Sequence, residues 1–372
     1  MNGSLRVDVA IAGGGIIGLS LGLELLRHGL SVTVIDRQQA MSSASWAAGG
    51  MLAVHDPQNP AALLPLSLRS WELYPAYLER VEGLSGKKVP LRTRRAMQYV
   101  AAERWVENST RSGAGGLVTA KEMADVAPAL DPLGHTFEWL DEGSVDPNDL
   151  REALPAAFRA AGGKLLEETE LLAVESVTGG VLVRTTRKMV SAGMFVNCRG
   201  AWSGEGAEGQ ERGLPVVPVK GQMANLRCKP ERLQCVVRAP GIYLVPRGDG
   251  RVTIGATIEH VGFDERVQET SIRRMAEAAL CLLPEAKAPP EMDMWAGLRP
   301  GTPDGLPILG RAAEKNCWHA TGHYRDGILL APVTAQVMAQ AMVGDSPDVA
   351  LEPFAATRFE ASRLAAGGLE GR

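Results

Sequence analysis

The sequence has few of the features that mark extracellular, metal-binding or membrane-spanning proteins. Its 372 residues include only five cysteines, which are Cys198, Cys228, Cys235, Cys281 and Cys317. They form no CxxC pair, and their odd number does not suit a disulfide framework, so we expect reduced thiols and no metal site. No stretch approaches the roughly 20 uninterrupted apolar residues of a spanning helix, so membrane insertion is not expected.

The charge pattern and the start of the chain argue against two further classes. Lys and Arg number 39 against 43 Asp and Glu, which gives a net charge of −4, and no long basic run is present. Nucleic acid is therefore not an expected partner. Residues 9–23 are apolar enough to resemble a signal peptide, but Asp8 precedes them and residues 13–15 are glycines. Because no basic segment leads into this run either, we expect a cytoplasmic protein.

What is present is the pattern of an α/β fold. Residues 7–12 are an apolar run of strand length, residues 16–28 have helical periodicity, and residues 31–35 are apolar and β-branched. This order predicts a βαβ unit at the start of the chain. With 372 residues and 45% hydrophobic content, the chain is long enough for about two domains.

Later segments predict a second, largely antiparallel sheet and further helices. Alternating or β-branched runs occur at residues 89–99, 180–186, 214–226, 241–246 and 251–257. Asp146 and Pro147 are an N-cap and a first-turn proline for a helix over residues 148–161. A helix rich in small residues is expected at 331–343. Because these blocks alternate along the chain, we predict two domains that are interleaved in sequence.

The first βαβ unit carries a dinucleotide-binding fingerprint. Residues 13–18 read GGGIIG and fit G-x-G-x-x-G between a strand and a helix. The expected contacts come from Gly13, Gly15, Ile16, Ile17 and Gly18. Gly13 permits a tight turn, Gly15 lets the backbone approach a pyrophosphate, and Gly18 allows close helix packing. Asp36, at the end of the second strand, would bond ribose hydroxyls. A glycine-rich turn beside a surface aspartate is the alternative, but it does not explain why these features coincide.

The fingerprint serves NAD and FAD alike, and the rest of the chain is more informative. It contains SSASWAAGGM at 42–51, DEGSVDP at 141–147, NCRGAWS at 197–203, PVKGQM at 218–223, YLVPR at 243–247, IGATIE at 254–259, WAGLRPGTPDGLPILG at 295–310 and GHYRDGILLAP at 322–332. Together these motifs resemble the D-amino-acid oxidase superfamily of flavoproteins, and within it the glycine oxidase (ThiO) branch. Two departures are Cys198-Arg199 in place of a small pair, and Ile258, where close relatives often have methionine. Both leave substrate preference open.

The resemblance implies a Rossmann-like FAD-binding domain and a substrate domain with a large, mostly antiparallel sheet over the flavin. The expected ranges are 1–85, 140–212 and 298–372 for the FAD-binding domain and 86–139 and 213–297 for the substrate-binding domain. Related sarcosine oxidases attach their flavin through a cysteine. Residues 298–302, at the corresponding position, contain no cysteine, so we expect non-covalent FAD.

The same resemblance assigns contacts to the cofactor by position. Beyond the fingerprint, the residues expected to touch FAD are Asp36, Arg37, Ser43, Ser45, Ala48, Gly49, Met51, Leu171, Gly200, Trp202, His323, Arg325, Asp326, Gly327, Ile328 and Leu329. Met51 is expected beside the isoalloxazine and Leu171 at the adenine end. The N-terminus of a helix that begins near Ala331 is expected to face the flavin pyrimidine edge. Met51 and Leu171 could equally be core residues, and His323 a packed loop residue.

An amino-acid substrate needs an anchor for its carboxylate, and an arginine fork makes a planar, bidentate contact that suits it. Arg299 stands at the carboxylate-binding position of the family, and the resemblance implies that Tyr243 donates a hydrogen bond to the same carboxylate. Arg325 is a further candidate in the catalytic site. The alternatives are an interdomain salt bridge for Arg299, a core position for Tyr243 and an acidic partner for Arg325.

These features favour an FAD-dependent oxidase of a small amino acid such as glycine, sarcosine or D-alanine. Hydride transfer to flavin N5 would give an imino acid, which water hydrolyses to a 2-oxo acid and ammonia, while molecular oxygen is the expected acceptor and becomes hydrogen peroxide. A homo-oligomer and a role in thiamine biosynthesis are further expectations. The alternatives are a dehydrogenase of D-amino acids or secondary amines that passes electrons to a carrier, and a flavin-binding subunit of a hetero-oligomer.

Overall fold

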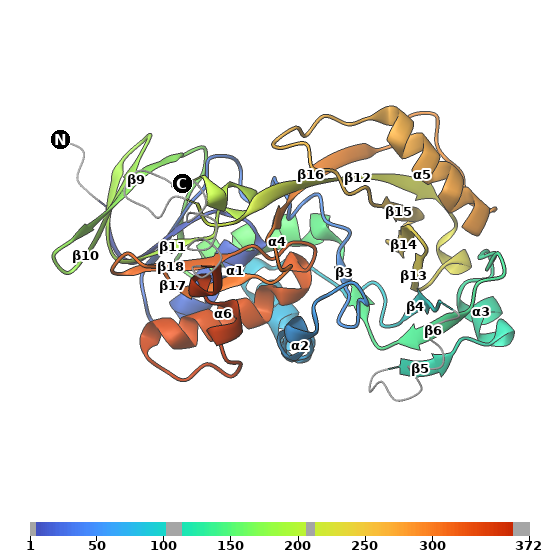
Figure 1. The fold of residues 1–372 in the computed structure, drawn as a ribbon, viewed down its shortest axis with the longest axis horizontal. Helices are drawn as coiled ribbons and strands as arrows, with labels where there is room; N and C mark the ends of the chain where they lie inside the picture. Colours follow the sequence, from blue (N-terminus) through green and yellow to red (C-terminus); the bar gives the residue numbers. More distant parts are fainter. Residues whose placement is uncertain (1–4, 102–113, 206–212, 360–372) are drawn as a thin grey trace, which may run out of the picture.

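The computed structural model describes residues 5–101, 114–205 and 213–359. Two lobes lie side by side along the longest axis, and each is built around an eight-stranded sheet (Figure 1). One lobe contains a largely parallel sheet with helices packed on it, and the other contains a mostly antiparallel sheet. The mixed α/β class that the sequence predicts is therefore confirmed.

The first sheet is the Rossmann-like sheet expected from the start of the chain. Its strand order is β17 (Ile308–Arg311), β18 (Cys317–Thr321), β11 (Met189–Asn197), β1 (Leu5–Ala12), β2 (Val32–Ile35) and β8 (Lys164–Leu166), and β10 (Gly180–Thr185) pairs with β11 and with β9 (Leu171–Val177). β1 pairs in parallel with β11 and β2. A strand with parallel neighbours on both sides is buried on both faces, which explains the nearly continuous apolar run at the start of the chain.

Four helices share one apolar core with this sheet. They are α1 (Ile16–Arg27), α2 (Leu64–Ser85), α4 (Pro147–Ala160) and α6 (Gly327–Val343). The strand–helix–strand order predicted at residues 7–35 is confirmed by β1, α1 and β2. The predicted cap of α4 is confirmed as well, because the Asp146 carboxylate accepts a hydrogen bond from the Asn148 amide at 2.9 Å.

The predicted start of the last long helix is wrong by one turn. We expected it near Ala331, but α6 begins at Gly327 and contains Pro332 in its interior. A proline there cannot donate to the carbonyl of Ile328, four residues earlier. The Tyr74 hydroxyl in α2 donates to that carbonyl instead, at 2.9 Å. This tertiary contact satisfies the carbonyl that the proline leaves free, so the helix continues through it.

The second sheet has the strand order β16 (Met294–Gly301), β12 (Val217–Arg227), β15 (Arg251–Gly255), β14 (Ile242–Pro246), β13 (Val236–Ala239), β4 (Ala96–Tyr99), β6 (Phe137–Leu140) and β5 (Ala114–Leu117). Helix α5 (Glu269–Leu282) packs on β12, β14 and β15, and α3 (Ala120–Val126) follows β5. The strand predicted at 89–99 is correct only from Ala96 onward. Pro90, which has no amide donor, and an isolated bridge at Thr93 precede it.

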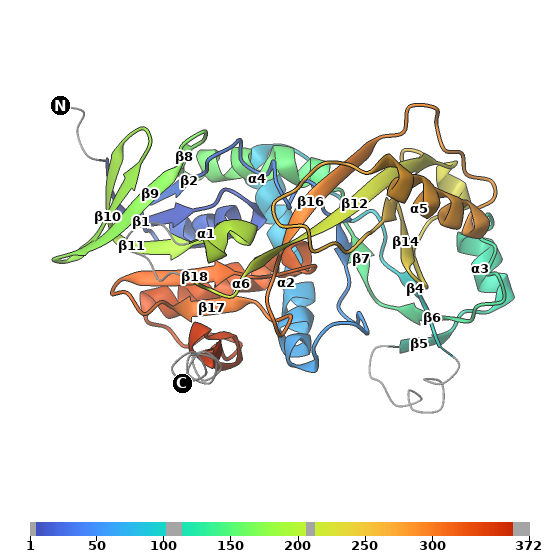
Figure 2. The same cartoon turned by 45° about the horizontal axis from the view of Figure 1, so that its top comes forward.

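The remaining short elements lie outside the two large sheets and the α-helices. They are the strands β3 (Met51–Leu52) and β7 (Gly143–Ser144) and the 3-10 helices η1 (Ala61–Leu63), η3 (Gly200–Gly204), η4 (Pro230–Arg232), η5 (Glu352–Phe354) and η6 (Ala356–Phe359). The long strands β12 and β16 extend from the second sheet toward the first and touch η3 (Figure 2). No helix in the described ranges is long and apolar enough to cross a membrane. The domain boundaries given above remain a prediction.

Candidate active site

The glycine-rich turn between β1 and α1 is packed too tightly for side chains. A Cβ atom on Gly13, where φ is +111°, would collide with the carbonyl of Cys198, and one on Gly18 would collide with the carbonyl of Gly13. Gly15 precedes the first turn of α1 and supplies no capping side chain. The amide of the next residue, Ile16, donates to the Ser45 hydroxyl at 3.0 Å. The turn therefore holds the start of α1 against the loop that contains Ser45.

Asp36 lies just after β2 and faces the same turn. Its carboxylate accepts hydrogen bonds from the backbone amides of Gly14 at 2.6 Å and Gln38 at 2.8 Å. Burial raises the pKa of Asp36, while the two amide donors act in the opposite direction. Next to it, the Arg37 guanidinium lies 3.6 Å from the ring centroid of Trp202. This contact joins η3 to the end of β2.

One long cavity runs from this turn to the second sheet. The predicted site residues that line it are Gly13, Gly15, Ile16, Ile17, Asp36, Arg37, Ser43, Ser45, Ala48, Gly49, Met51, Leu171, Gly200, Trp202, Tyr243, Arg299, His323, Arg325, Asp326, Gly327 and Ile328. Gly18 and Leu329 do not reach it. Gly18 faces the Gly13 carbonyl, and Leu329 is fully buried in the helical core. The packing role expected for Gly18 agrees with this position, and the cofactor contacts of these two residues remain predictions.

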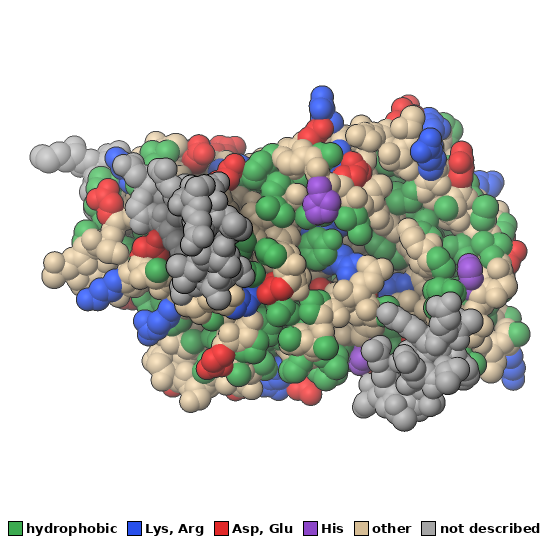
Figure 3. All heavy atoms as spheres, viewed as in Figure 1, with side chains coloured by type: hydrophobic (Ala, Val, Ile, Leu, Met, Phe, Trp, Pro, Cys, Tyr) green, Lys and Arg blue, Asp and Glu red, His purple; other side chains and the backbone are tan. Residues whose placement is uncertain are grey.

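A row of residues in register across four strand pairings forms the wall of the cavity in the second sheet. The row runs through Gln98, Arg238, Tyr243, Gly255 and Met223. All five line the cavity. Residues opposite one another on adjacent strands share a face of the sheet, so this register brings together segments far apart in sequence. Figure 3 shows basic side chains among hydrophobic ones between the two lobes.

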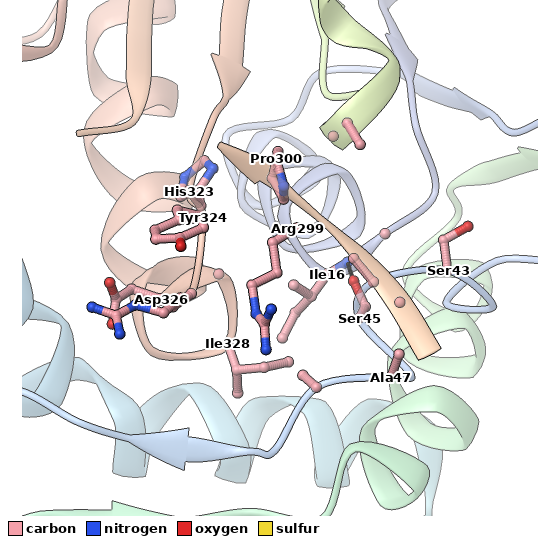
Figure 4. Close-up of a pocket in the computed structure, with 18 of the residues that line it drawn as sticks. Ile16, Ser43, Ser45, Ala47, Arg299, Pro300, His323, Tyr324, Asp326 and Ile328 are labelled. Carbon is pink, nitrogen blue, oxygen red and sulfur yellow. Dashed lines mark hydrogen bonds between the residues drawn. The ribbon is translucent and has the colours of Figure 1, made fainter. Parts of the chain in front are cut away.

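Tyr243 and Arg299 are neighbours in the cavity. Burial raises the pKa of the Tyr243 phenol, and the Arg299 guanidinium opposes this effect from close by. The phenol therefore stays protonated at neutral pH and donates at 2.9 Å to the Met223 sulfur. Arg299 extends from β16 into the space between the start of α1 and the loop before α6 (Figure 4).

The Arg299 guanidinium lacks an acidic partner within the described ranges. Its Nη1 donates a hydrogen bond to the carbonyl of Thr257, at 3.2 Å. The interdomain salt bridge that was the alternative for Arg299 is therefore not found among the described residues. A cation in a partly enclosed cavity with most of its donors free is suited to an anionic ligand.

Arg325 points to polar side chains near the cavity rim. Its Nη1 donates to the Gln58 side chain at 2.5 Å, and its Nη2 lies 4.0 Å from an Asp56 carboxylate oxygen. Asp56 is therefore an acidic partner of Arg325, as the alternative interpretation expected, but the contact between them is long. Arg325 still lines the cavity, but two of its nitrogens are engaged by protein groups.

The loop before α6 contributes two buried titratable groups. His323 shares a hydrogen bond of 3.0 Å with the Thr334 hydroxyl, and burial lowers the pKa of His323 to about 3. It is therefore a neutral, packed residue. Asp326 precedes the first residue of α6, and burial raises its pKa to about 7. Figure 4 shows His323, Tyr324 and Asp326 on this loop, facing the cavity from the side opposite Ser43 and Ser45.

Two buried arginines at the site were missed from the sequence. Arg247 donates to the carbonyls of Val145 at 3.0 Å and Gly49 at 2.9 Å, and so attaches the second sheet to the loop over residues 42–51. Arg238 lines the cavity, and its Nη2 lies 2.8 Å from the buried Glu142. The available signal was a charged residue inside or directly after an apolar strand segment, because such a residue is rarely buried without a specific partner.

The shape of the cavity fits FAD. Gly15, Ile16 and Ile17 expose the positive end of α1 to the cavity, where a pyrophosphate would be stabilised. Asp36 and the Arg37–Trp202 pair line the part of the cavity near the first sheet, where an adenosine would lie, and Tyr243 lines it from the second sheet. Because Gly15 has no Cβ, the Ser45 hydroxyl can approach the backbone of this turn closely. These residues would hold an elongated dinucleotide with its far end beside Arg299.

Known proteins match this chain over nearly its whole length. A profile of FAD-dependent oxidoreductases (DAO) matches residues 8–341. The glycine oxidase of Geobacillus kaustophilus (strain HTA426) is 33% identical over 366 residues, which are 95% of this chain and 97% of that protein. The bifunctional protein ThiO/ThiG of Synechocystis sp. is 35% identical over 95% of this chain, but over only 54% of its own length.

Solved structures agree with these matches. The crystal structure of glycine oxidase from Geobacillus kaustophilus superimposes with a TM-score of 0.87 at 32% identity, and the alignment covers 95% of this chain and 99% of that one. The L-proline dehydrogenase of P. horikoshii has the same fold, with a TM-score of 0.84 at 22% identity. The sequence motifs, the cavity and these matches agree, and the chain belongs to the family of FAD-dependent oxidoreductases, within which it is similar to the glycine oxidases.

Proposed function

We propose that this protein catalyses the FAD-dependent oxidative deamination of a small amino acid, with glycine, sarcosine or D-alanine as candidate substrates and molecular oxygen as the acceptor. The products are an imino acid, its hydrolysis products 2-oxo acid and ammonia, and hydrogen peroxide. The observation that carries the proposal is the Arg299 fork, which has no acidic partner among the described residues and lies beside the Tyr243 hydroxyl in the same cavity as the dinucleotide fingerprint. Glycine as substrate is also what the similarity to glycine oxidases suggests.

In this proposal, Arg299 binds the substrate carboxylate through two parallel N–H donors, and Tyr243 donates a third hydrogen bond to it. Two fixed donors orient the α-carbon, which is the main contribution that the chain makes to the reaction. When bound, FAD supplies the acceptor for the hydride that leaves the α-carbon. His323 is a weak base, because burial lowers its pKa to about 3, and its Nε2 is engaged by Thr334.

A small substrate is favoured by the side chains around the anchor. Met51, Met223 and Tyr243 line the same cavity as Arg299. Ile258, which stands where methionine is common in relatives, also lines the cavity but is 54% exposed. We therefore assign Ile258 to the mouth, where it would influence entry more than the fit of the α-carbon. Faster turnover of D-phenylalanine or D-proline than of glycine would contradict the small-substrate proposal.

Non-covalent attachment of FAD is part of the proposal. The cysteine that lines the cavity within the described ranges is Cys198, and burial raises the pKa of its thiol. A thiol that stays protonated is a poor nucleophile toward a flavin ring. Acid precipitation of the yellow protein should leave all the flavin in the supernatant. Flavin colour retained in the pellet would exclude this form of attachment.

Anaerobic mixing with substrate tests the reaction itself. The purified holoenzyme is mixed without oxygen with glycine, sarcosine or D-alanine, and the flavin absorbance is followed before air is admitted. We expect bleaching within seconds to minutes and, on admission of air, rapid recovery of colour with formation of hydrogen peroxide. Bleaching without recovery in air would favour the dehydrogenase alternative, and no bleaching would favour the subunit alternative.

A role in thiamine biosynthesis, a cytoplasmic location and a homo-oligomeric state complete the proposal. The first rests on resemblance to the ThiO branch and on the similarity to the bifunctional protein ThiO/ThiG. Deletion of the gene should then produce a growth requirement that thiamine relieves. Growth without thiamine would separate the enzyme activity from this pathway.

A further inference from the structure

Two sequence motifs near the site contain residues that do not line the cavity. In PVKGQM (218–223) and IGATIE (254–259), some residues line the cavity, but Lys220, Gln222, Thr257 and Glu259 do not. Lys220 and Gln222 are nevertheless completely buried. A buried lysine and a buried glutamine need hydrogen-bond partners, because burial without partners is costly.

The four side chains form one connected hydrogen-bond network. One carboxylate oxygen of Glu259 accepts hydrogen bonds from Gln222 Nε2 at 2.7 Å and from the Thr257 hydroxyl at 2.5 Å. The other lies 3.3 Å from Lys220 Nζ, which donates to the carbonyl of Arg266 at 3.0 Å. The Thr257 hydroxyl also accepts a hydrogen bond from the backbone amide of Gln222 at 2.9 Å. The network fixes residues 257–259 beside β12.

Thr257 connects this network to Arg299. The Arg299 side chain starts on β16, crosses β12 at Gly221, and donates to the carbonyl of Thr257 at 3.2 Å. A Cβ atom on Gly221 would collide with the guanidinium. The guanidinium therefore packs directly over Gly221, where no side chain blocks it, and contacts the Thr257 carbonyl.

We infer that Thr257, held by Glu259, Gln222 and Lys220, is a positioning residue that orients the Arg299 fork. The inference rests on the proposed function, in which Arg299 binds the substrate carboxylate. One donor of Arg299 is used by the Thr257 carbonyl, and the remaining donors stay available for a carboxylate. Since a long side chain loses rotamer entropy when it binds, an anchor that is already fixed binds more tightly than a mobile one.

The matched pair Thr257→Val and Thr257→Ser isolates the hydroxyl that joins Thr257 to Glu259. Both variants keep the main-chain carbonyl, and only valine removes the hydrogen bonds. In the holoenzyme, acetate binding is measured by its effect on the flavin absorbance, and KM and kcat are measured with glycine. For Thr257→Val we expect acetate Kd and glycine KM to rise roughly five- to thirty-fold, less than for a lost hydrogen bond made directly to a charge because the Thr257 carbonyl is kept, with a smaller change in kcat. Thr257→Ser should stay within about two-fold of the wild type.

Two further variants separate positioning from loss of structure. Thr185→Val makes the same change at a buried threonine of β10, whose hydroxyl donates to the Lys188 carbonyl at 2.6 Å in the first sheet. It should leave acetate binding unchanged. If Thr257→Val does not fold, Glu259→Gln takes its place, because it weakens the contact to Lys220 and keeps an acceptor for Thr257. Glu259→Gln should also raise the acetate Kd, but by less than Thr257→Val does.

A double-variant comparison distinguishes this inference from the proposed function. If Thr257 acts through Arg299, adding Thr257→Val to Arg299→Met should weaken acetate binding no further. An additive effect, equal acetate affinity of Thr257→Val and wild type, or equal losses in Thr257→Val and Thr257→Ser would each overturn the inference. Unchanged acetate binding in Arg299→Met alone would instead overturn the anchor role of Arg299.

Discussion

The Asp36 carboxylate illustrates how single residues prepare the cavity for a cofactor. It is held by two backbone amides, those of Gly14 and Gln38, and lines the cavity at the end of β2. Its burial raises its pKa. The hydroxyls of a ribose are suitable partners for the remaining lone pairs, because charge-assisted hydrogen bonds in a buried site are strong.

Replacing Asp36 with alanine should therefore weaken FAD binding. The lost charge-assisted contact is worth on the order of 1.5–3 kcal/mol, which corresponds to a roughly ten- to hundred-fold rise in the FAD dissociation constant. Fluorescence titration of apoprotein with FAD measures it. Equal dissociation constants for the variant and the wild type would mean that Asp36 does not face the ribose.

Asp326 should make stability depend on pH. Burial raises its pKa in the folded state to about 7, from an ordinary value of 3.8. The neutral carboxyl is favoured in the fold, so its stabilising contribution is complete below about pH 4 and is lost as pH rises to about 7. Asp326→Asn removes this dependence. The unfolding free energy of the wild type relative to the variant should fall by up to about 1.4 kcal/mol per pH unit in that window.

Urea unfolding at several pH values, with equal flavin content in both proteins, measures this difference. Arg325, Arg238 and Asp56 act on the Asp326 charge from nearby, so they should stay unchanged in the comparison. Parallel stability profiles for the wild type and Asp326→Asn would show that Asp326 titrates in the folded protein as it does in the unfolded chain.

At the scale of elements, α6 shows where local sequence signals fail. The apolar pattern, the strand lengths and the cap at Asp146 predicted β1, α1, β2 and α4, because these signals act within a few residues. The predicted start near Ala331 was wrong, because the local cost of Pro332 inside α6 is compensated from elsewhere in the fold. Its compensation comes from Tyr74, more than 250 residues earlier in the chain. Only the packing of α2 against α6 brings the hydroxyl to the free carbonyl.

Tyr74→Phe tests this compensation. The variant keeps the ring and leaves the Ile328 carbonyl without its hydroxyl partner. Both groups are buried, so the unfolding free energy should fall by about 1–3 kcal/mol. Because Ile328 lines the cavity at the start of α6, flavin binding should weaken as well. Chemical denaturation measures the first effect, and an unchanged midpoint and slope would contradict the account of α6.

At the scale of the whole molecule, the site exists only where the two sheets meet. The fingerprint, Asp36 and the motif with Arg299 could be found from the sequence, since each is a local pattern. The row from Gln98 to Met223 could not, because strand register across four pairings is a tertiary property. The same holds for the link between Arg299 of β16 and Thr257, which crosses β12 at Gly221.

The central claim joins the two lobes: the first sheet holds FAD, and Arg299 of the second sheet holds the substrate carboxylate. Arg299→Met keeps most of the apolar stem and removes the fork, and Arg299→Lys keeps the charge without the two parallel donors. FAD content and thermal stability should change little in both variants, because the fingerprint lies in the other lobe. Lysine should restore only part of the activity that methionine loses.

The most direct measurement is the rate of flavin reduction by glycine in anaerobic stopped-flow mixing, compared between the wild type and Arg299→Met at equal flavin content. Loss of one partner of a buried charged pair is worth about 2–5 kcal/mol, so the second-order rate constant of reduction should fall roughly thirty-fold to several thousand-fold. Equal rate constants in the two proteins would contradict the account, and Arg325 would then become the leading candidate for the carboxylate anchor.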